Sequence, residues 1–206
     1  MIELQTPLSE LAVRALDTGD TVSLSGIVVT ARDAAHKYII DNFIASFNDK
    51  EKEVYDKLKK YLDGGVIYHC GPIVSKNDDG RYTFVSAGPT TSIREEPYED
   101  IVLEAFNVRG IIGKGGMGDK TLSALKKKGA VYFQAVGGAG VLIADNTIDV
   151  IDVLKLDFGI PEAMWVIKVK ELKLTVTMDS MGGSIHRDIE ALSGERLKEA
   201  EKRLFN

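Results

Sequence analysis

The sequence predicts a mixed α/β fold in which helices cover a mixed β-sheet. Runs rich in β-branched residues alternate with stretches whose apolar residues recur every three or four positions, as they do on one face of a helix. Residues 108–136 read as strand, glycine turn, helix and strand in succession. This interleaving is typical of layered α/β domains. The chain has 206 residues and no linker-like segment, so we expect a single domain over 1–206, with 1–20 as a leading arm or helix.

The first half of the chain starts its regular structure with TVSLSGIVVT, which is rich in β-branched residues. A helix is indicated further on by Val54, Leu58 and Leu62, which are spaced four residues apart, and Gly64-Gly65 ends it. Asp79-Gly80 is a hairpin turn signal. The predicted elements are a strand at 21–30, a helix at 31–43, a helix at 51–62, a strand at 66–70 and a returning strand at 82–87.

The second half begins after the break at Gly88-Pro89. Asp119 is expected to cap a helix that ends at Gly129. Ser193 is expected to cap the last helix, whose apolar face carries Leu197 and Leu204. The predicted elements are a helix at 96–106, a strand at 108–112, a helix at 119–128, a strand at 131–136, strands at 165–170 and 172–178, and a helix from 193 onward.

Charge and hydropathy exclude several function classes. The chain has 26 basic and 31 acidic residues, a net charge of −5, which is unsuited to general nucleic-acid binding. No apolar run reaches the roughly 18 residues that a membrane span needs. The N-terminus lacks the basic and apolar regions of a signal peptide, so a cytoplasmic location is expected.

Thiol ligands for a metal are scarce in this chain. Cys70 is the single cysteine, so this chain cannot form an internal disulfide or hold a zinc or iron–sulfur site by itself. We therefore predict no metal ligands here, and any metal chemistry must come from another chain. Of the histidines, His69 is expected to be a satisfied core residue, and His186 is expected to be solvated in a loop.

The turn Gly113–Gly118 (GKGGMG) follows a predicted strand and precedes a predicted helix, which is the context of a dinucleotide-binding GxGxxG motif. However, the acidic residue expected about 20 positions later is missing. Two other interpretations stay open. In the first, the segment is a structural glycine turn. In the second, it is an anion site in which helix N–H groups and Lys114 bind a carboxylate or phosphate.

Arg32 and Arg94 both fall at predicted strand ends or turns, where functional sites commonly lie. Each guanidinium can bind one carboxylate through two parallel hydrogen bonds, so two arginines and Lys114 would suit a small dicarboxylate. The alternative is that these are surface arginines paired with acidic neighbours, Asp33 for Arg32 and Glu95 or Glu96 for Arg94.

Several motifs together resemble the β subunit, or C-terminal domain, of class I fumarases and L-tartrate dehydratases, which are iron–sulfur hydro-lyases. AGPTTSIR and IGKGGM are specific, and TARDAAH is fairly specific. The resembling stretches run in the family's order at 26–37, 68–74, 86–94, 110–120, 131–138 and 176–182.

The resemblance implies a swivelling β/β/α domain that works with a separate α subunit in a hetero-oligomer. It implies that the α subunit binds the [4Fe-4S] cluster and that the substrate is a small dicarboxylate. By position in the motifs, Arg32, Thr90 and Arg94 correspond to substrate-binding residues. Thr90 and Lys114 correspond to catalytic residues, with Thr90 as the proton acceptor.

The implied reaction is reversible hydration of fumarate to malate, or alternatively dehydration of L-tartrate. Cluster iron on the α subunit would polarise the departing hydroxyl. Two further hypotheses stay open, a nucleotide-binding oxidoreductase domain and a non-catalytic assembly protein. If Arg32, Thr90, Arg94 and Lys114 act on one substrate, their side chains must meet around a single cleft at one edge of the fold, and the helix at 119–128 should begin there.

Overall fold

The computed structural model describes residues 1–205 and confirms the mixed α/β class. The strands are β1 Ile2–Gln5, β2 Thr21–Thr30, β3 Val66–Tyr68, β4 Ile73–Lys76, β5 Tyr82–Ser86, β6 Gly110–Gly113, β7 Val131–Gln134, β8 Thr147–Leu154 and β9 Met164–Met178. The α-helices are α1 Glu10–Arg14, α2 Asp33–Ile39, α3 Lys52–Leu62, α4 Glu99–Phe106, α5 Asp119–Lys128, α6 Gly140–Asp145 and α7 Ile185–Phe205. A π-helical turn, Ile40–Ile44, and 3₁₀ turns at Asp49–Glu51, Ser92–Glu95 and Leu156–Phe158 complete the set.

The main sheet has the strand order β1-β2-β3-β6-β7-β9-β8. Strands β2, β3, β6 and β7 are parallel neighbours. The long strand β9 runs antiparallel to both β7 and β2, and thereby joins the two ends of the parallel set. The sheet consequently closes into a barrel-like arrangement, with β1 and β8 added outside the closed ring.

Both faces of the central strands are buried, because successive side chains point to opposite sides of a strand. One hydrophobic cluster contains Tyr68, Phe133 and Trp165, and another contains their neighbours Ile67 and Tyr132. This explains why the sequence of these strands is almost continuously apolar. The second cluster also includes the inner faces of α2 to α5.

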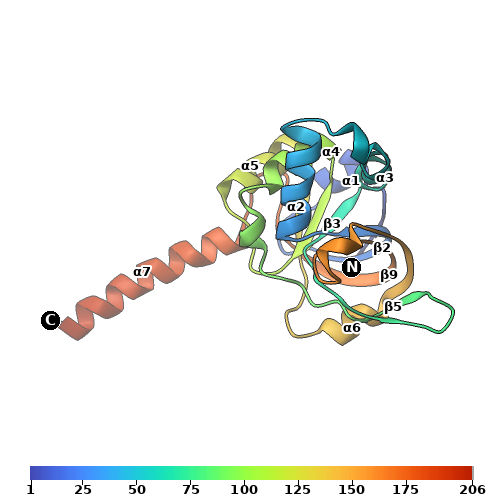
Figure 1. Ribbon diagram of the computed structural model, residues 1–206. Coiled ribbons are helices and arrows are strands. Elements are labelled where there is room, and N and C mark those ends of the chain that lie inside the picture. Colours follow the sequence, from blue (N-terminus) through green and yellow to red (C-terminus); the bar gives the residue numbers. More distant parts are fainter. Residues whose placement is uncertain (206) are drawn as a thin grey trace.

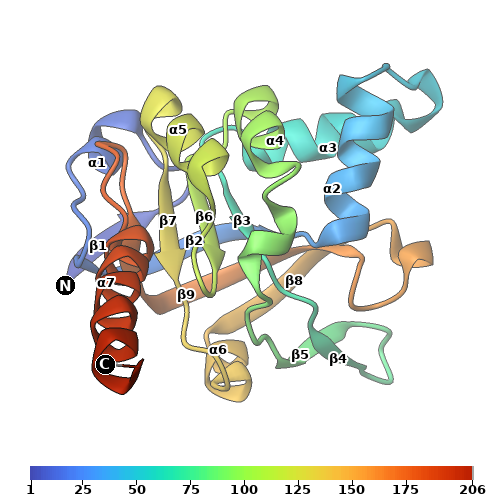
Figure 2. The same ribbon diagram turned by 90° about the vertical axis from the view of Figure 1, so that its left-hand side faces the viewer.

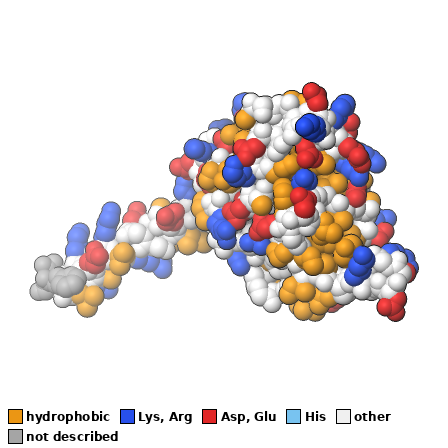
Figure 3. Space-filling view, viewed as in Figure 1, with side chains coloured by type: hydrophobic (Ala, Val, Ile, Leu, Met, Phe, Trp, Pro, Cys, Tyr) orange, Lys and Arg blue, Asp and Glu red, His pale blue; other side chains and the backbone are white. Residues whose placement is uncertain are grey.

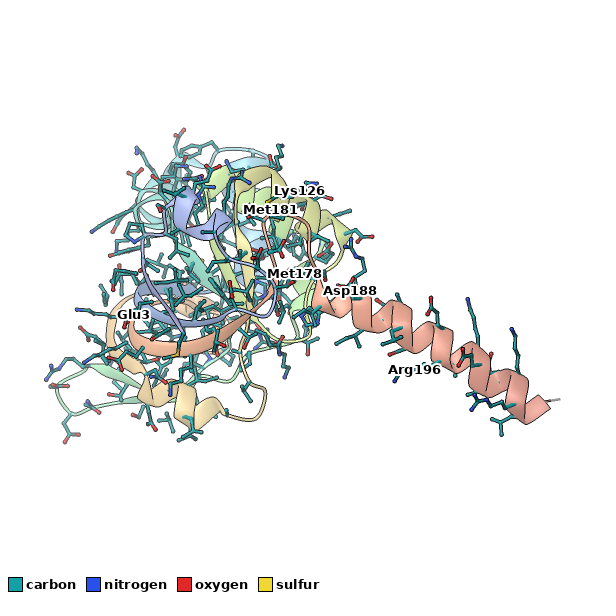
Figure 4. The ribbon with its side chains drawn as sticks, turned by 180° about the vertical axis from the view of Figure 1, so that it is seen from behind. Glu3, Lys126, Met178, Met181, Asp188 and Arg196 are labelled. Atoms are coloured by element: carbon teal, nitrogen blue, oxygen red, sulfur yellow. The ribbon has the colours of Figure 1, made fainter. Side chains whose placement is uncertain are left out.

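Helices α2, α3, α4 and α5 cover one side of the parallel strands, whereas α6 and the β4–β5 hairpin lie on the other side (Figure 2). The final helix α7 projects away from the body and carries the C-terminal end (Figure 1). Met178 and Met181 lie near the base of α7, and Arg196 lies farther out along it (Figure 4). Within residues 1–205, no helix combines the length and the apolar character needed to cross a membrane.

The first twenty residues, expected to form a leading arm or helix, contain both a strand of the main sheet and a short helix. Strand β1 pairs in parallel with β2, and α1 follows it. Leu4, Leu8, Val13 and Leu16 are buried in the core cluster. Burial of these side chains attaches the segment to the sheet.

The prediction of two strands at 165–170 and 172–178 was wrong, since β9 is continuous. Glu171 has a positive φ of 53°, and its N–H donates to Ser25 Oγ opposite the irregular pairing between Leu24 and Gly26. The charged residue at this bulge therefore led the sequence analysis to divide one strand into two. Strand β8 and helix α6 were not predicted.

The final helix begins at Ile185 and not at Ser193, because Ser184 Oγ accepts a hydrogen bond from the Arg187 N–H and starts the helix earlier. His186 thus lies in the first helical turn, where its Nε2 is 2.9 Å from Thr177 Oγ1. The expectation of a solvated loop histidine was wrong, since His186 is only partly exposed and burial lowers its pKa.

Replacement of Gly26 by alanine is expected to destabilise the fold. Gly26 has a φ of +112°, and a Cβ there would overlap Thr6 Oγ1 and come within 3.1 Å of Thr6 N. The positive φ strains the backbone of any residue with a Cβ, and the new methyl group clashes with Thr6. We therefore expect the free energy of unfolding to fall by roughly 1–3 kcal/mol, as measured by urea titration. Gly194→Ala is the control, since nothing lies within 4 Å of that position in α7 and alanine favours a helix. Equal stability of Gly26→Ala and the wild type would show that position 26 has room for a side chain.

Candidate functional site

The carboxyl ends of β2, β3 and β6 lie side by side, because these strands are parallel neighbours. Arg32 lies two residues after the end of β2, and Lys114 directly follows β6. The loop after β5 crosses this edge. There the Thr90 N–H donates to the His69 carbonyl (2.7 Å), and the Ser92 N–H donates to the Lys114 carbonyl (3.1 Å). Segments far apart in sequence are thereby brought to one edge.

Arg32 lies at the start of α2, with its side chain largely buried. Its Nη1 is 3.2 Å from Glu162 Oε1, and the other oxygen of Glu162 accepts the Ala34 N–H. A Cβ at position 71 would overlap Arg32, so glycine at that position makes room for the guanidinium. Arg32 Nε is buried without a hydrogen-bond partner among the residues described. An unsatisfied buried donor of this kind is available for an anionic ligand.

Arg94 forms an ion pair with Asp33, the first residue of α2. The pair links the loop after β5 to the segment that carries Arg32. The Arg94 side chain is 55% exposed, so the guanidinium is accessible from outside. The acidic partners suggested by sequence neighbourhood were wrong for both arginines, since Arg32 pairs with Glu162 and Arg94 with Asp33.

Thr90 and Lys114 are both partly buried. Lys114 forms an isolated parallel bridge with Thr91, and its side chain passes close to Gly137, where an added Cβ would be 3.5 Å from Lys114 Cδ. The fold therefore brings Arg32, Thr90, Arg94 and Lys114 to the same edge of the parallel strands.

Helix α5 begins at this edge as expected, but its N-terminus is already occupied. The Glu96 carboxylate accepts hydrogen bonds from the N–H groups of Gly118, Lys120 and Thr121 and from the Thr121 hydroxyl. The prediction that Asp119 caps this helix was wrong, since Gly118 is the N-cap and Glu96 supplies the acceptor. A carboxylate in this position uses the donors that a bound phosphate needs and repels a second anion. The nucleotide and helix-start anion interpretations of the glycine turn are disfavoured.

Beneath the edge lies a cluster of fully buried titratable side chains, His36, His69, Glu95 and Glu99. His36 Nε2 is 2.8 Å from Glu99 Oε2, and His69 Nε2 is 3.0 Å from the same oxygen. The His69 contact is a hydrogen bond, whereas His36 Nε2 makes an ionic contact with the oxygen without hydrogen-bond alignment. The three ligand atoms lie within 4.8 Å of one another, which is close enough for a cation, and the alternative without a cation is one His69 hydrogen bond and one His36 ionic contact to the same Glu99 oxygen.

The surroundings shift the pKa of each group in the cluster. Burial lowers the pKa of His36, but the Glu99 and Glu95 carboxylates outweigh this and raise it to about 9. Burial raises the pKa of Glu99, but His36 and His69 outweigh this and lower it to about 2. For His69 burial prevails and lowers its pKa, whereas burial raises the pKa of Glu95 to about 7. The pattern corresponds to a charged His36–Glu99 pair beside a neutral His69.

His69 is a satisfied core residue, as predicted, and Cys70 is buried. Sequence patterns did not predict the cluster of which His69 is part. The available signal was that His69 directly follows β3 and that His36 lies in α2, the helix that follows the neighbouring parallel strand β2. Glu99, which completes the cluster, carried no local signal within its helix.

Apolar side chains gather beside this edge on the surface. Val141 and Leu142 of α6 are 62% and 69% exposed, and Val136 is 66% exposed. Figure 3 shows an apolar area over α6 and its surroundings. The Ala87 N–H donates to the Gly140 carbonyl, which places α6 directly against the loop that continues to Thr90. Exposed apolar areas of this kind mark interaction surfaces.

The chain is similar to proteins of known families. Residues 1–189 match the family described as Fumarase C-terminus. A relative from Geobacillus stearothermophilus, named fumarate hydratase class I, is 46% identical over 206 residues, which cover this whole chain but only 37% of that protein. Relatives named L(+)-tartrate dehydratase subunit beta occur in Methanocaldococcus jannaschii, 38% identical over 93% of this chain and 94% of the relative, and in Escherichia coli K12, 35% identical over 94% and 90%.

Proposed function

Because the chain belongs to the fumarase C-terminus family, we propose that it is the β subunit of an iron–sulfur hydro-lyase. The relatives described above carry the names of a fumarate hydratase and of tartrate dehydratase β subunits. We propose fumarate hydration to malate as the reaction, with L-tartrate dehydration as the alternative. The observation that carries the proposal is the placement of four residues at the edge of the sheet where the parallel strands β2, β3 and β6 end. These residues are Arg32, Thr90, Arg94 and Lys114.

In this proposal Arg32 and Arg94 bind the two carboxylates of a four-carbon substrate. The free Nε of Arg32 and the accessible guanidinium of Arg94 support that role. Removal of a proton next to a carboxylate builds additional negative charge, which the two guanidinium groups and Lys114 stabilise. Thr90 is the proposed proton acceptor. A hydroxyl is a weak base at neutral pH, so Thr90 requires activation by a neighbouring group.

The single cysteine of this chain, Cys70, is unsuited to binding an iron–sulfur cluster. Cys70 is 1% exposed, and burial raises the pKa of its thiol to about 12, which disfavours the thiolate that iron requires. We therefore assign the [4Fe-4S] cluster to a partner α subunit. The apolar surface of Val136, Val141 and Leu142 beside the site is the proposed contact for that partner.

If the partner α subunit holds the iron–sulfur cluster, this chain alone should be colourless and inactive. We would produce it alone and together with an α subunit under anaerobic conditions, and assay fumarate, malate and L-tartrate by absorbance. The joint preparation is expected to be brown and to convert one of these substrates. A brown, active preparation of this chain alone would refute the proposal, and so would a complex that converts none of the three.

A further inference from the structure

The buried cluster under the site is arranged as one connected network. Glu99 Oε2 lies against Nε2 of both His36 and His69. His69 Nδ1 is 2.9 Å from Ser92 Oγ, which also accepts a hydrogen bond from the Tyr132 hydroxyl at 2.8 Å. All five side chains are fully buried. The network thus joins α2 and α4 to the end of β3, to β7 and to the loop after β5.

The protonation states follow from the partners of each ring nitrogen. His36 Nδ1 donates to the Arg32 carbonyl at 2.9 Å, and its Nε2 lies 2.8 Å from the Glu99 carboxylate as an ionic contact outside hydrogen-bond geometry, so the neighbouring carboxylates favour the imidazolium form of His36. His69 donates from Nε2 to Glu99 and accepts at Nδ1 from the Ser92 hydroxyl, so it is neutral. The remaining groups that face His36 are Glu95, 3.5 Å from Nδ1, and the ring of Tyr98.

Every segment that carries a proposed site residue is bonded to this network through its backbone. The Arg32 carbonyl accepts from the ring and the N–H of His36. The Thr90 N–H donates to the His69 carbonyl, and the Ser92 N–H donates to the Lys114 carbonyl. Ser92 itself lies between Thr90 and Arg94. The network therefore connects the backbones of all three turns at the edge.

A buried ion pair of this kind contributes little net stability, because the cost of removing two charges from water roughly cancels their attraction. The hydrogen bonds around it, from His36 to the Arg32 carbonyl and from His69 to Glu99 and Ser92, nevertheless specify one arrangement of these groups. We infer that His36, Glu99, His69 and Ser92 are positioning residues, which hold the turns of Arg32, Thr90, Arg94 and Lys114 in register for one four-carbon substrate. The inference rests on the proposed function of the edge and adds residues that do not touch the substrate.

The test uses the complex with its α subunit and the variants Ser92→Ala, Glu99→Gln and Arg94→Ala. A displacement of about 1 Å in a site costs roughly a hundredfold in rate, so we expect Ser92→Ala and Glu99→Gln to lower kcat/KM about tenfold to hundredfold. If Glu99 acts through the placement of Arg94, the double variant Glu99→Gln/Arg94→Ala should lose little more than Arg94→Ala alone. Ser123→Ala is the control, since Ser123 is exposed on α5 and should leave the kinetics unchanged.

Amide hydrogen exchange of the same complexes gives a measurement that does not depend on the reaction. Segments 30–36 and 88–95 should exchange at least tenfold faster in Glu99→Gln, while strand β8 exchanges as in the wild type. Wild-type exchange in both segments would overturn the inference. Wild-type kcat/KM in both Ser92→Ala and Glu99→Gln would also overturn it. A wild-type complex without activity would instead refute the proposed function, while the exchange result still decides the inference.

A metal ion is the remaining explanation for two imidazoles and a carboxylate at one place. Elemental analysis of the purified wild-type complex distinguishes it. We expect no metal beyond the iron of the cluster, and the same content in His69→Gln. A stoichiometric second metal that disappears in His69→Gln would overturn the positioning inference.

Discussion

Replacement of Arg94 by alanine is expected to lower kcat/KM of the active complex about thirtyfold to thousandfold. A charge-assisted bidentate contact between a guanidinium and a carboxylate is worth roughly 2–4 kcal/mol, and alanine removes it. The fold should tolerate the change, because the Arg94 side chain is 55% exposed and its ion pair with Asp33 is partly solvated. Steady-state kinetics with malate, fumarate and L-tartrate would measure the loss.

Two further arginine variants make this measurement specific. Arg94→Lys should recover only part of the activity, since an ammonium cannot reproduce the two parallel hydrogen bonds of a guanidinium. Arg81→Ala is the matched control, because Arg81 pairs with Asp79 in the exposed β4–β5 hairpin and should not affect the kinetics. Wild-type kinetics in Arg94→Ala would show that Arg94 is an ordinary surface residue.

Replacement of Glu99 by alanine is expected to produce a large loss of stability. The variant leaves the His36 imidazolium buried without its main counter-charge and leaves a gap beside His69. Breaking one side of a buried ion pair costs about 3–5 kcal/mol, which is a large part of a typical domain's stability. Urea denaturation followed by circular dichroism would report the change. Glu104→Ala on the same helix is the control, since Glu104 forms an exposed pair with Lys127 and should change stability by less than about 0.5 kcal/mol.

The same pair makes stability depend on pH in a defined way. The pKa of His36 is raised from 6.5 to about 9, so its contribution is complete below about pH 6.5 and is lost as pH rises through 9. The pKa of Glu99 is lowered from 4.5 to about 2, so its contribution is complete above pH 4.5 and is lost as pH falls through 2. The pair should therefore stabilise the fold most between about pH 4.5 and 6.5, and Glu99→Gln should flatten both slopes. Identical pH profiles for the variant and the wild type would contradict this assignment.

The order of most strands and helices follows from local patterns in the sequence. Repetition of β-branched runs and amphipathic stretches predicts the parallel β6–α5–β7 unit, and it predicts that Arg32 and Lys114 come after strand ends. Parallel neighbours have their carboxyl ends at one edge, so the shared position of these residues is implied by connectivity alone. Local patterns are less informative for β8, whose sequence TIDVIDVL carries acidic residues on a partly exposed outer strand.

Tertiary structure alone decides the features that depend on residues distant in sequence. Closure of the sheet requires β9 to pair with β2 and β7 at once, and a bulge opposite Glu171 keeps it a single strand. Glu96 caps α5 from 22 residues away along the chain, in place of the adjacent Asp119. The charged network joins His36, His69 and Glu99 only because α2 and α4 pack over the end of β3. Sequence spacing determines which residues follow a strand. Which charged groups pair depends on their distance and on the exclusion of water between them, and both arise only when the helices and strands pack together.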